Sequence, residues 1–352
     1  MKMKEFLLIM KNLIRDSLTL PLLPTSRLVF ISDLHLGDGG KTDDFRHNEA
    51  LLMASLREFY LPGGYTLVLN GDIEELHKFT LADIQKRYEK LYDIFRQFDQ
   101  AGRLVKLVGN HDLGLLNNPD AGFKIHHALC LEHPQTKIMA FHGHQAYKLF
   151  MQYNFLSDFL VRNVVEPLKL ANREKPLTSK RRYKAERRIY RASKELGLIS
   201  INGHTHRPLF ESYSKYDNLR WNLESLLRKY AGTADGERDQ LESQIKLYAE
   251  EFKRLNKQER KSRVSRSLYE REEMLVPCMF NSGCATAKSG YTALELADDT
   301  IALAFWTKTG TARAYVEKDS AEQSTLADSP WKRYVLTRDS IEYIIARARL
   351  LA

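Results

Sequence analysis

Polar residues that can bind metal ions follow five short apolar runs of the sequence. The runs lie at 28–31, 66–69, 104–108, 138–141 and 198–201. The polar residues that follow them, in the same order, are Asp33 and His35, then Asp72, then Asn110 and His111, then His142 and His144, and finally His204 and His206. Apolar runs of four or five residues rich in branched side chains are typical of buried strands. Ligands of open α/β sheets bind beyond the carboxyl ends of the strands, so the sequence predicts that these side chains meet at one edge of a sheet.

The chemistry of these side chains indicates a divalent metal site. Asp, His and Asn offer mixed oxygen and nitrogen donors without a thiolate, a set that suits Mn, Fe or Zn without choosing among them. A single Asp-x-His or His-x-His motif is also compatible with a turn that carries a core histidine. Five such motifs, each directly after a predicted strand, favour one shared metal centre instead.

This run of motifs resembles the calcineurin-like metallophosphoesterases. The matching motifs are Asp33-x-His35, Gly71-Asp72, Gly109-Asn110-His111-Asp112, His142-Gly143-His144 and Gly203-His204-x-His206. They span residues 27–210, and we expect the resemblance to resume at 276–307. The resemblance implies an α/β fold built as a four-layer α/β/β/α sandwich with helical insertions and a dinuclear metal centre. It leaves the substrate open, because the family includes phosphatases, nucleases, nucleotide hydrolases and lipid-precursor pyrophosphatases.

The resemblance also implies a role for each motif residue. The first metal would be bound by Asp33, His35 and His206, both metals by the bridging Asp72, and the second metal by Asn110, His142 and His204. Paired cations about 3.5–4 Å apart lower the pKa of a shared water, so a bridging hydroxide could attack phosphorus in line near neutral pH. His144 could support the ligands or contact substrate, and a purely structural histidine is the alternative.

Two further residues are candidates for acid catalysis. By the resemblance, His111 points at the phosphoryl group, where an imidazolium would neutralise developing charge and protonate the leaving oxygen. Such a histidine needs an orienting carboxylate. Glu75 stands three residues after Asp72, where family members often carry that acid. A solvent-facing glutamate is the alternative for this position.

The chain is predicted to consist of one phosphoesterase domain with several additions. The domain would comprise residues 27–210 and 274–307, with strands alternating with helices as in a parallel α/β sheet. The additions are an N-terminal helical extension over 1–26, a basic helical cap insertion over 146–197, a helical hairpin over 211–273 and a C-terminal extension over 308–352. In the hairpin, Leu219 to Tyr230 and Leu241 to Leu255 show the three-and-four spacing of a two-helix seam. We expect an exposed arm that could form a homodimer contact.

The net charge of +9 is concentrated in one segment. Residues 161–194 hold twelve Lys and Arg but only three acids, so this segment is where we expect an anionic substrate to bind. Four basic residues share one face of a predicted helix there: Arg181, Lys184, Arg188 and Arg191. A solvated basic helix that packs on the core is the alternative.

Several substrates and partners fit these observations. Related hydrolases of UDP-2,3-diacylglucosamine, which act in lipid A synthesis, insert helices at the position of 146–194. This sequence departs from them in His111, where they usually carry Arg, in the hairpin and in a longer C-terminal tail. Nucleic acid is a less favoured substrate, because the rest of the chain has no excess of basic charge. A non-catalytic scaffold on the same fold is disfavoured by the intact ligand set.

Composition limits the class of protein and its location. The chain has 352 residues, 43% of them hydrophobic and 28% charged, which excludes collagen-like and wholly disordered proteins. No run approaches 18 apolar residues, and the three cysteines match no zinc or disulfide pattern. We therefore expect an intracellular, cytoplasmic protein. The helix predicted within 1–26 should pack on the domain, and contact with an anionic inner membrane face is the alternative.

Overall fold

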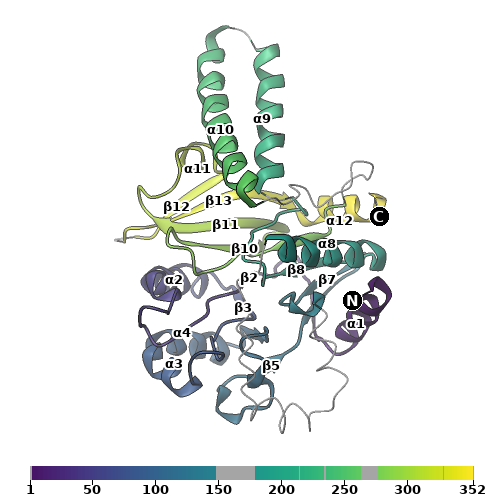
Figure 1. Cartoon of the computed structure of the whole chain (residues 1–352), viewed down its shortest axis with the longest axis vertical. Coiled ribbons are helices and arrows are strands. Elements are labelled where there is room, and N and C mark those ends of the chain that lie inside the picture. Colours follow the sequence, from purple (N-terminus) through teal and green to yellow (C-terminus); the bar gives the residue numbers. More distant parts are fainter. Residues whose placement is uncertain are drawn as a thin grey trace.

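Two β-sheets that pack face to face form the centre of the molecule (Figure 1). The computed structural model describes residues 2–147, 179–213, 215–233, 235–262, 276–327 and 329–351. The larger sheet runs in the order β12 (Glu322–Thr325), β13 (Trp331–Ser340), β11 (Thr300–Lys308), β10 (Tyr291–Ala297), β2 (Leu28–Ile31), β3 (Thr66–Asn70), β4 (Leu104–Leu107) and β5 (Ile125–His126). The smaller sheet runs in the order β1 (Leu18–Pro21), β6 (Leu129–His133), β7 (Thr136–Ala140), β8 (Ile199–Asn202) and β9 (Met279–Asn281).

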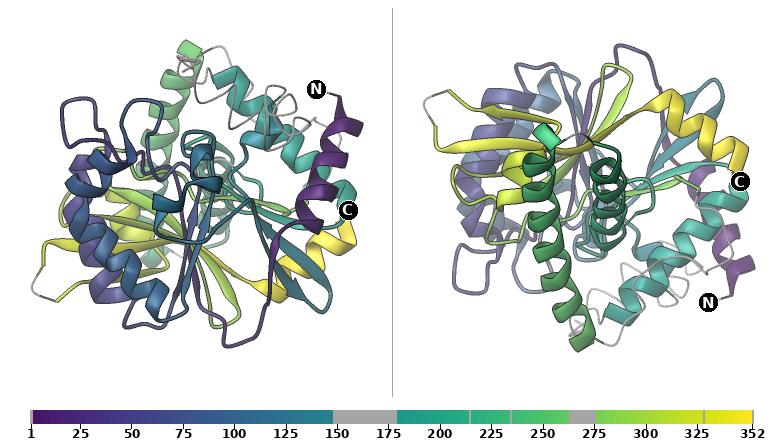
Figure 2. Two further views of the ribbon diagram at one scale, coloured as in Figure 1. Left: turned by 90° about the horizontal axis from the view of Figure 1, so that it is seen from below. Right: turned by 90° about the horizontal axis from the view of Figure 1, so that it is seen from above.

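Helices cover the outer face of each sheet. The larger sheet is covered by α2 (Glu49–Ser55), the π-helical turn Leu56–Tyr60, α3 (Leu81–Arg87) and α4 (Glu89–Gln100), and the smaller one by α1 (Met3–Arg15) and α8 (Ser179–Leu196). Figure 2 shows these two helical layers on opposite sides of the sheets. Short 3-10 turns occur at Phe45–His47, Leu113–Asn117, Pro119–Ala121 and His144–Ala146. The four-layer α/β/β/α sandwich is therefore confirmed.

Strand alternation explains why both faces of the sheets are apolar. Successive side chains of a strand point to opposite faces, so each strand of a covered sheet must be apolar throughout. In β2, Phe30 packs between the sheets whereas Val29 and Ile31 pack against the helices. In β7, Ile138 faces the other sheet and Met139 faces α1 and α8. The predicted parallel pairing holds for β2, β3, β4 and β5 and for β7, β8 and β9, but β10, β11, β13 and β12 are antiparallel.

Both ends of the chain contribute to the sandwich, which differs from the expected extensions. At the N-terminus, α1 buries Phe6 and Met10 against the body, and β1 pairs with β6. After residue 308, the segment contains α11 (Ala314–Asp319), the sheet strands β12 and β13, and α12 (Ile341–Leu351), which packs between the layers through Ile344. The domain therefore does not close near residue 307. The strand β13 was not predicted, because it contains polar residues. Its Arg333 is buried and forms an ion pair with Glu295 of β10.

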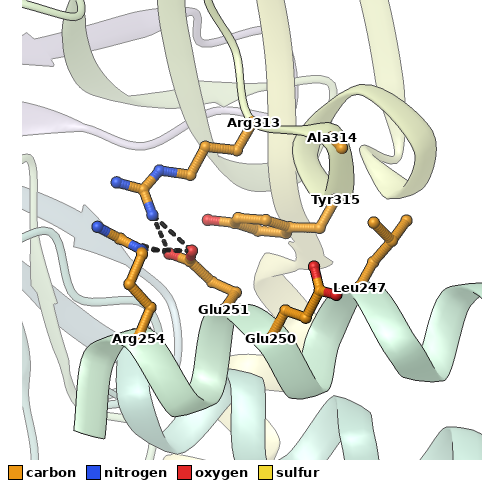
Figure 3. A pocket seen from close by; sticks show the side chains of 7 residues that line it. All are labelled: Leu247, Glu250, Glu251, Arg254, Arg313, Ala314 and Tyr315. Carbon is orange, nitrogen blue, oxygen red and sulfur yellow. Dashed lines mark hydrogen bonds and ion pairs between the residues drawn. The ribbon is translucent and has the colours of Figure 1, made fainter. Parts of the chain in front are cut away.

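The predicted hairpin is formed by α9 (Lys215–Gly232) and α10 (Asp235–Ser262), which project together from the body (Figure 1). Among the described side chains of the two helices, the buried hydrophobic residues are Leu219, Leu241 and Tyr248, and the ring of Tyr216 on α9 lies 4.9 Å from that of Phe252 on α10. Its base is tied to the domain through Glu251, as Figure 3 shows. The Glu251 carboxylate accepts hydrogen bonds from Arg254, at 2.8 Å, and from Arg313 at the start of α11. The arm is thus anchored where it leaves the domain.

None of the helices in the described ranges is long and apolar enough to cross a membrane.

Candidate metal centre

Loops that follow β2, β3, β4, β7 and β8 bring the predicted ligands together. Five of these ligands have left-handed backbone conformations, with φ values between 52° and 64°: Asp33, His35, Asp72, His204 and His206. A non-glycine residue in this region costs about 1–3 kcal/mol and persists only where its surroundings hold it. Such strain concentrated on one set of polar residues marks this edge of the sheets as a functional site.

Glycines let these loops approach the ligands closely. A Cβ atom on Gly109 would lie 2.1 Å from Oδ1 of Asp72, and one on Gly203 would lie 2.6 Å from Oδ2 of Asp33. Both distances are far below van der Waals contact, so a larger residue would push the carboxylates out of place. Glycine thus precedes Asn110 and His204 in the motifs because there is no room for a side chain at either position.

The first group of candidate ligands consists of Asp33, His35 and His206. Oδ1 of Asp33 lies 3.1 Å from Nε2 of His206 and 3.8 Å from Nε2 of His35. The two histidine Nε2 atoms are 3.2 Å apart. One potential ligand atom from each residue lies within 4.8 Å of the others, which is the spacing that one cation requires.

The second group consists of Asp72, His142 and His204, and all three are buried. Oδ2 of Asp72 lies 2.9 Å from Nε2 of His142 and 3.9 Å from Nε2 of His35. Asp72 therefore lies between the two groups, and Oδ1 of Asp33 is likewise 3.9 Å from Nε2 of His142. The ring of His142 is fixed from behind, because its Nδ1 lies 2.9 Å from the carbonyl oxygen of Asn70.

Buried polar atoms in the centre lack hydrogen-bond partners within the described part of the chain. They include Oδ1 of Asn110 and Nε2 of His204. Unpaired buried polar atoms are rare in proteins, and an unfilled ligand position is one of the few explanations. The donor set, the glycine cradle and these two atoms all fit divalent cations.

Neighbouring carboxylates and histidines shift one another's pKa values in the centre. Burial alone would raise the pKa of Asp33, but the charges of His206 and His142 hold it far below its usual value. Burial would lower the pKa of His142, but the charges of Asp72 and Asp33 raise it to about 9. Burial would also lower the pKa of His206, but the charge of Asp33 raises it to about 9. His204 behaves differently, since burial lowers its pKa to about 3. A bound cation must displace the protons of His142 and His206, so metal binding should release protons.

His111 and Glu75 lie beside the ligands. Oε1 of Glu75 is 2.7 Å from Nδ1 of His111, and Oε2 is 3.1 Å from Nδ1 of His35. Nε2 of His111 is 4.0 Å from Oδ2 of Asp72. Burial would raise the pKa of Glu75, yet the hydrogen bonds with both histidines hold it well below its usual value. The structure thus places Glu75 as the carboxylate partner of His111, and not as a solvent-facing side chain.

The candidate substrate residues are divided between the interior and the surface. His144 is buried near His142 and His204, with ring centroids 5.5 and 6.4 Å away. On α8, the candidates Arg181, Lys184 and Arg191 are exposed, as is Glu195. Arg188 is half-buried, and its Nη1 donates to the carbonyl oxygen of Ala146. The remainder of the predicted cap, residues 148–178, lies outside the described residues.

Sequence reasoning assigned no role to three residues that the structure places at the centre. Asp112 accepts hydrogen bonds from the backbone amides of Gly109, at 2.6 Å, and Ile73, at 2.7 Å, and so ties together the loops of Asn110 and Asp72. The ring of His77 lies 4.4 Å from that of His111. Cys284 interacts with His206. Asp112 belongs to a motif and could have been found there, whereas no spacing in the sequence links His77 or Cys284 to the site.

Fold and site together define a metal-binding α/β sandwich of the phosphoesterase class. The family model for calcineurin-like phosphoesterases matches residues 26–208, more than half of the chain. The chain therefore belongs to the calcineurin-like phosphoesterase family.

Three of the solved structures that match this chain do so at low identity. A single mutant of Vps29 from Entamoeba histolytica is 14% identical, with 81% of this chain and 94% of that chain covered and a TM-score of 0.34. The phosphoesterase Yfce from E. coli is 12% identical, with 78% and 91% covered and a TM-score of 0.29. An uncharacterized predicted phosphoesterase from Streptococcus pneumoniae TIGR4 is 14% identical, with 80% and 89% covered and a TM-score of 0.27. No curated protein matches the chain.

Proposed function

We propose that the protein hydrolyses phosphate esters with the help of two divalent cations of the Mn, Fe or Zn type. The observation that carries this proposal is the position of Asp72, whose Oδ2 lies 2.9 Å from His142 and 3.9 Å from His35. A carboxylate between two histidine groups is the arrangement that a shared ligand of two metals needs. Family membership supports the same chemistry.

Seven side chains would hold the cations. They are Asp33, His35 and His206 for the first, Asn110, His142 and His204 for the second, and Asp72 for both. When bound, two such cations neutralise phosphate charge and lower the pKa of a water, which supplies a nucleophile near neutral pH. Five of these residues have left-handed backbone conformations, which persist only because the surrounding fold holds them.

His111 is the residue that we propose as the acid. Its Nδ1 is 2.7 Å from Glu75, so the Nδ1 proton is held there and Nε2 is left to face a substrate oxygen. A protonated Nε2 could donate to the leaving oxygen as its bond to phosphorus breaks. The side chain of His111 remains 19% exposed, which leaves it accessible from the site mouth.

We propose that the substrate is anionic and extends beyond the reacting phosphate. The exposed Arg181, Lys184 and Arg191 of α8 support this, because they place three basic charges on the surface of a helix whose one exposed acid is Glu195. A nucleotide-linked lipid of the UDP-2,3-diacylglucosamine type would fit this surface with its phosphates, and an anionic membrane face could contact the same residues. Nucleic acid is the alternative that the substrate tests must separate.

A substrate panel tests the proposed function. The chain is freed of metal with chelator, reloaded with Mn²⁺ and assayed on p-nitrophenyl phosphate, bis-p-nitrophenyl phosphate, UDP-linked acyl sugars and single-stranded DNA. We expect hydrolysis of at least one phosphoester that depends on Mn²⁺ and is lost in Asp72→Asn. Binding of metal without hydrolysis of any of these compounds would favour a non-catalytic scaffold.

A further inference from the structure

The loop that carries His204 and His206 is held from outside by one acid of α8. Glu186 is fully buried, and its Oε2 lies 2.9 Å from Nη1 of Arg207. Thr205 is also buried, and its Oγ1 accepts a hydrogen bond from Nδ2 of Asn281 at 3.2 Å. Arg207, which directly follows His206, is therefore held by a buried carboxylate.

Residues of this loop alternate between two sides. His206 faces the ligands, with Nε2 3.1 Å from Oδ1 of Asp33, and the amide of His204 donates to Oδ2 of Asp33 at 2.8 Å. Arg207 instead donates to Glu186, and Thr205 accepts from Asn281. Candidate ligands thus alternate with residues that other elements hold, so a displacement of Glu186 should displace Arg207 and the adjacent His206.

The loop needs such support because its backbone is strained. His204 has a φ of 64° and His206 a φ of 57°, both in the left-handed region. Strain of this kind persists only where surrounding contacts over-determine the conformation. On the other side of the loop, Nδ2 of Asn281 donates to the carbonyl oxygen of Gly203 at 2.7 Å. Glu186 supplies the opposing contact.

Glu186 is placed rigidly enough to do this. It lies on α8 next to Ala185 and three residues before Ile189, and both are 1% exposed in the core beneath the helix. The helix is otherwise rich in Lys and Arg, so a buried acid there is unusual for its surroundings. Arg207, whose side chain is 32% exposed, connects this buried acid to the loop.

We infer that Glu186 is a positioning residue of the metal centre, which fixes the loop of His204 and His206 by holding Arg207. It also links the helix that carries the exposed basic residues to the metal ligands. This inference rests on the proposed function, since it assumes that these histidines bind metal. Residues that orient metal ligands from behind typically contribute 10–100-fold to metal affinity.

The test compares metal affinity in matched variants of the full chain. Mn²⁺ is titrated calorimetrically into chelator-treated wild type, Glu186→Gln and Arg207→Gln, and the thermal unfolding of each is followed in chelator. Glu295→Gln is the control, because Glu295 and Arg333 form another buried ion pair, each 3% exposed, between β10 and β13. We expect both loop-contact variants to lose about 10–100-fold in affinity for at least one Mn²⁺. The control should keep wild-type affinity even if it unfolds at a lower temperature.

Each other outcome has a distinct meaning. If the wild type binds no Mn²⁺, both the proposed function and this inference are overturned. If the wild type binds Mn²⁺ and both loop-contact variants bind it equally well, the inference alone is overturned. An equal loss in Glu295→Gln would also overturn it, because the effect would then reflect general stability. Arg207→Gln removes the contact from a partly exposed side chain, so it keeps the test decisive should Glu186→Gln fail to fold.

Discussion

One carboxylate, Glu75, contacts both His111 and His35. Its Oε1 lies 2.7 Å from Nδ1 of His111, and its Oε2 lies 3.1 Å from Nδ1 of His35. The loop after β3 thus supplies the candidate bridge, Asp72. Three residues later it supplies Glu75, which contacts both a candidate metal ligand and the candidate proton donor. This sharing separates the expected effects of mutations at the two positions.

Replacing His111 should impair chemistry while leaving the metals in place. His111→Ala is expected to lower kcat by about 10²–10⁴-fold, the usual contribution of a positioned acid. Metal content should stay near that of the wild type, because the assigned ligands are unchanged. Kinetics and elemental analysis on the same preparation check this. Loss of metal together with activity would show that His111 is itself a ligand.

Replacing Glu75 should lower both kcat and the affinity for metal. Glu75→Gln keeps the size of the side chain but removes the charge that both histidines face, so kcat should fall less than in His111→Ala. Because His35 is also released, the affinity of one cation should fall by about 10-fold. Metal titration beside the kinetic assay separates the two effects. Wild-type metal affinity in this variant would mean that the contact with His35 does not matter for binding.

The positions of the ligands could be predicted because each follows a strand directly. Asp33 lies two residues after β2 of the larger sheet, and His142 lies two residues after β7 of the smaller sheet, so the strand pattern predicted that both lie just beyond the carboxyl end of a strand. The strand β13 could not be recognised in this way. Its Arg333 is buried only because Glu295, distant in sequence, pairs with it. Glu186 was hidden for a similar reason, since within a basic segment an acid reads as a solvated residue.

The exposed basic face of α8 should govern the binding of a large anionic substrate. The triple variant Arg181→Glu, Lys184→Glu and Arg191→Glu is expected to raise KM for that substrate and to leave hydrolysis of bis-p-nitrophenyl phosphate nearly unchanged. Arg188 is left intact because it donates to Ala146 within the fold. The KM effect should shrink with added salt, since exposed charges are screened over about 8–10 Å. Equal losses for both substrates would show that these residues shape the active site.

Removing the hairpin should preserve the metals at some cost in stability. The ends of the insertion lie close together, because Oγ of Ser212 donates to the carbonyl oxygen of Val276 at 3.0 Å. A short Gly-rich linker in place of residues 214–270 should therefore keep β8 beside β9. The melting temperature should fall, since Arg313 and Tyr315 lose their contacts with α10. Circular dichroism and metal analysis check the outcome, and an insoluble product would mean that the hairpin is part of the core.

The junction between the hairpin entry and α12 should make stability depend on pH. Burial and a hydrogen bond with Asp339 raise the pKa of Glu211 from 4.5 to about 7, although Arg347 opposes the shift. The folded state then binds more protons than the unfolded state between these two pH values, so the free energy of unfolding should fall as pH rises from about 4.5 to 7. Glu211→Gln should flatten this fall, by on the order of 1 kcal/mol. Urea unfolding at several pH values measures it, and identical pH profiles would contradict the assignment.

The proposal of a bridged pair of cations depends most on Asp72. The direct measurement is the number of Mn²⁺ ions bound per chain at saturation, by elemental analysis of gel-filtered protein, for wild type and Asp72→Asn. We expect the wild type to bind two ions and the variant to bind both more weakly, because one carboxylate lies between the two groups of ligands. A stoichiometry of one or none in the wild type, or an Asp72→Asn variant that keeps two ions at wild-type affinity, would contradict it.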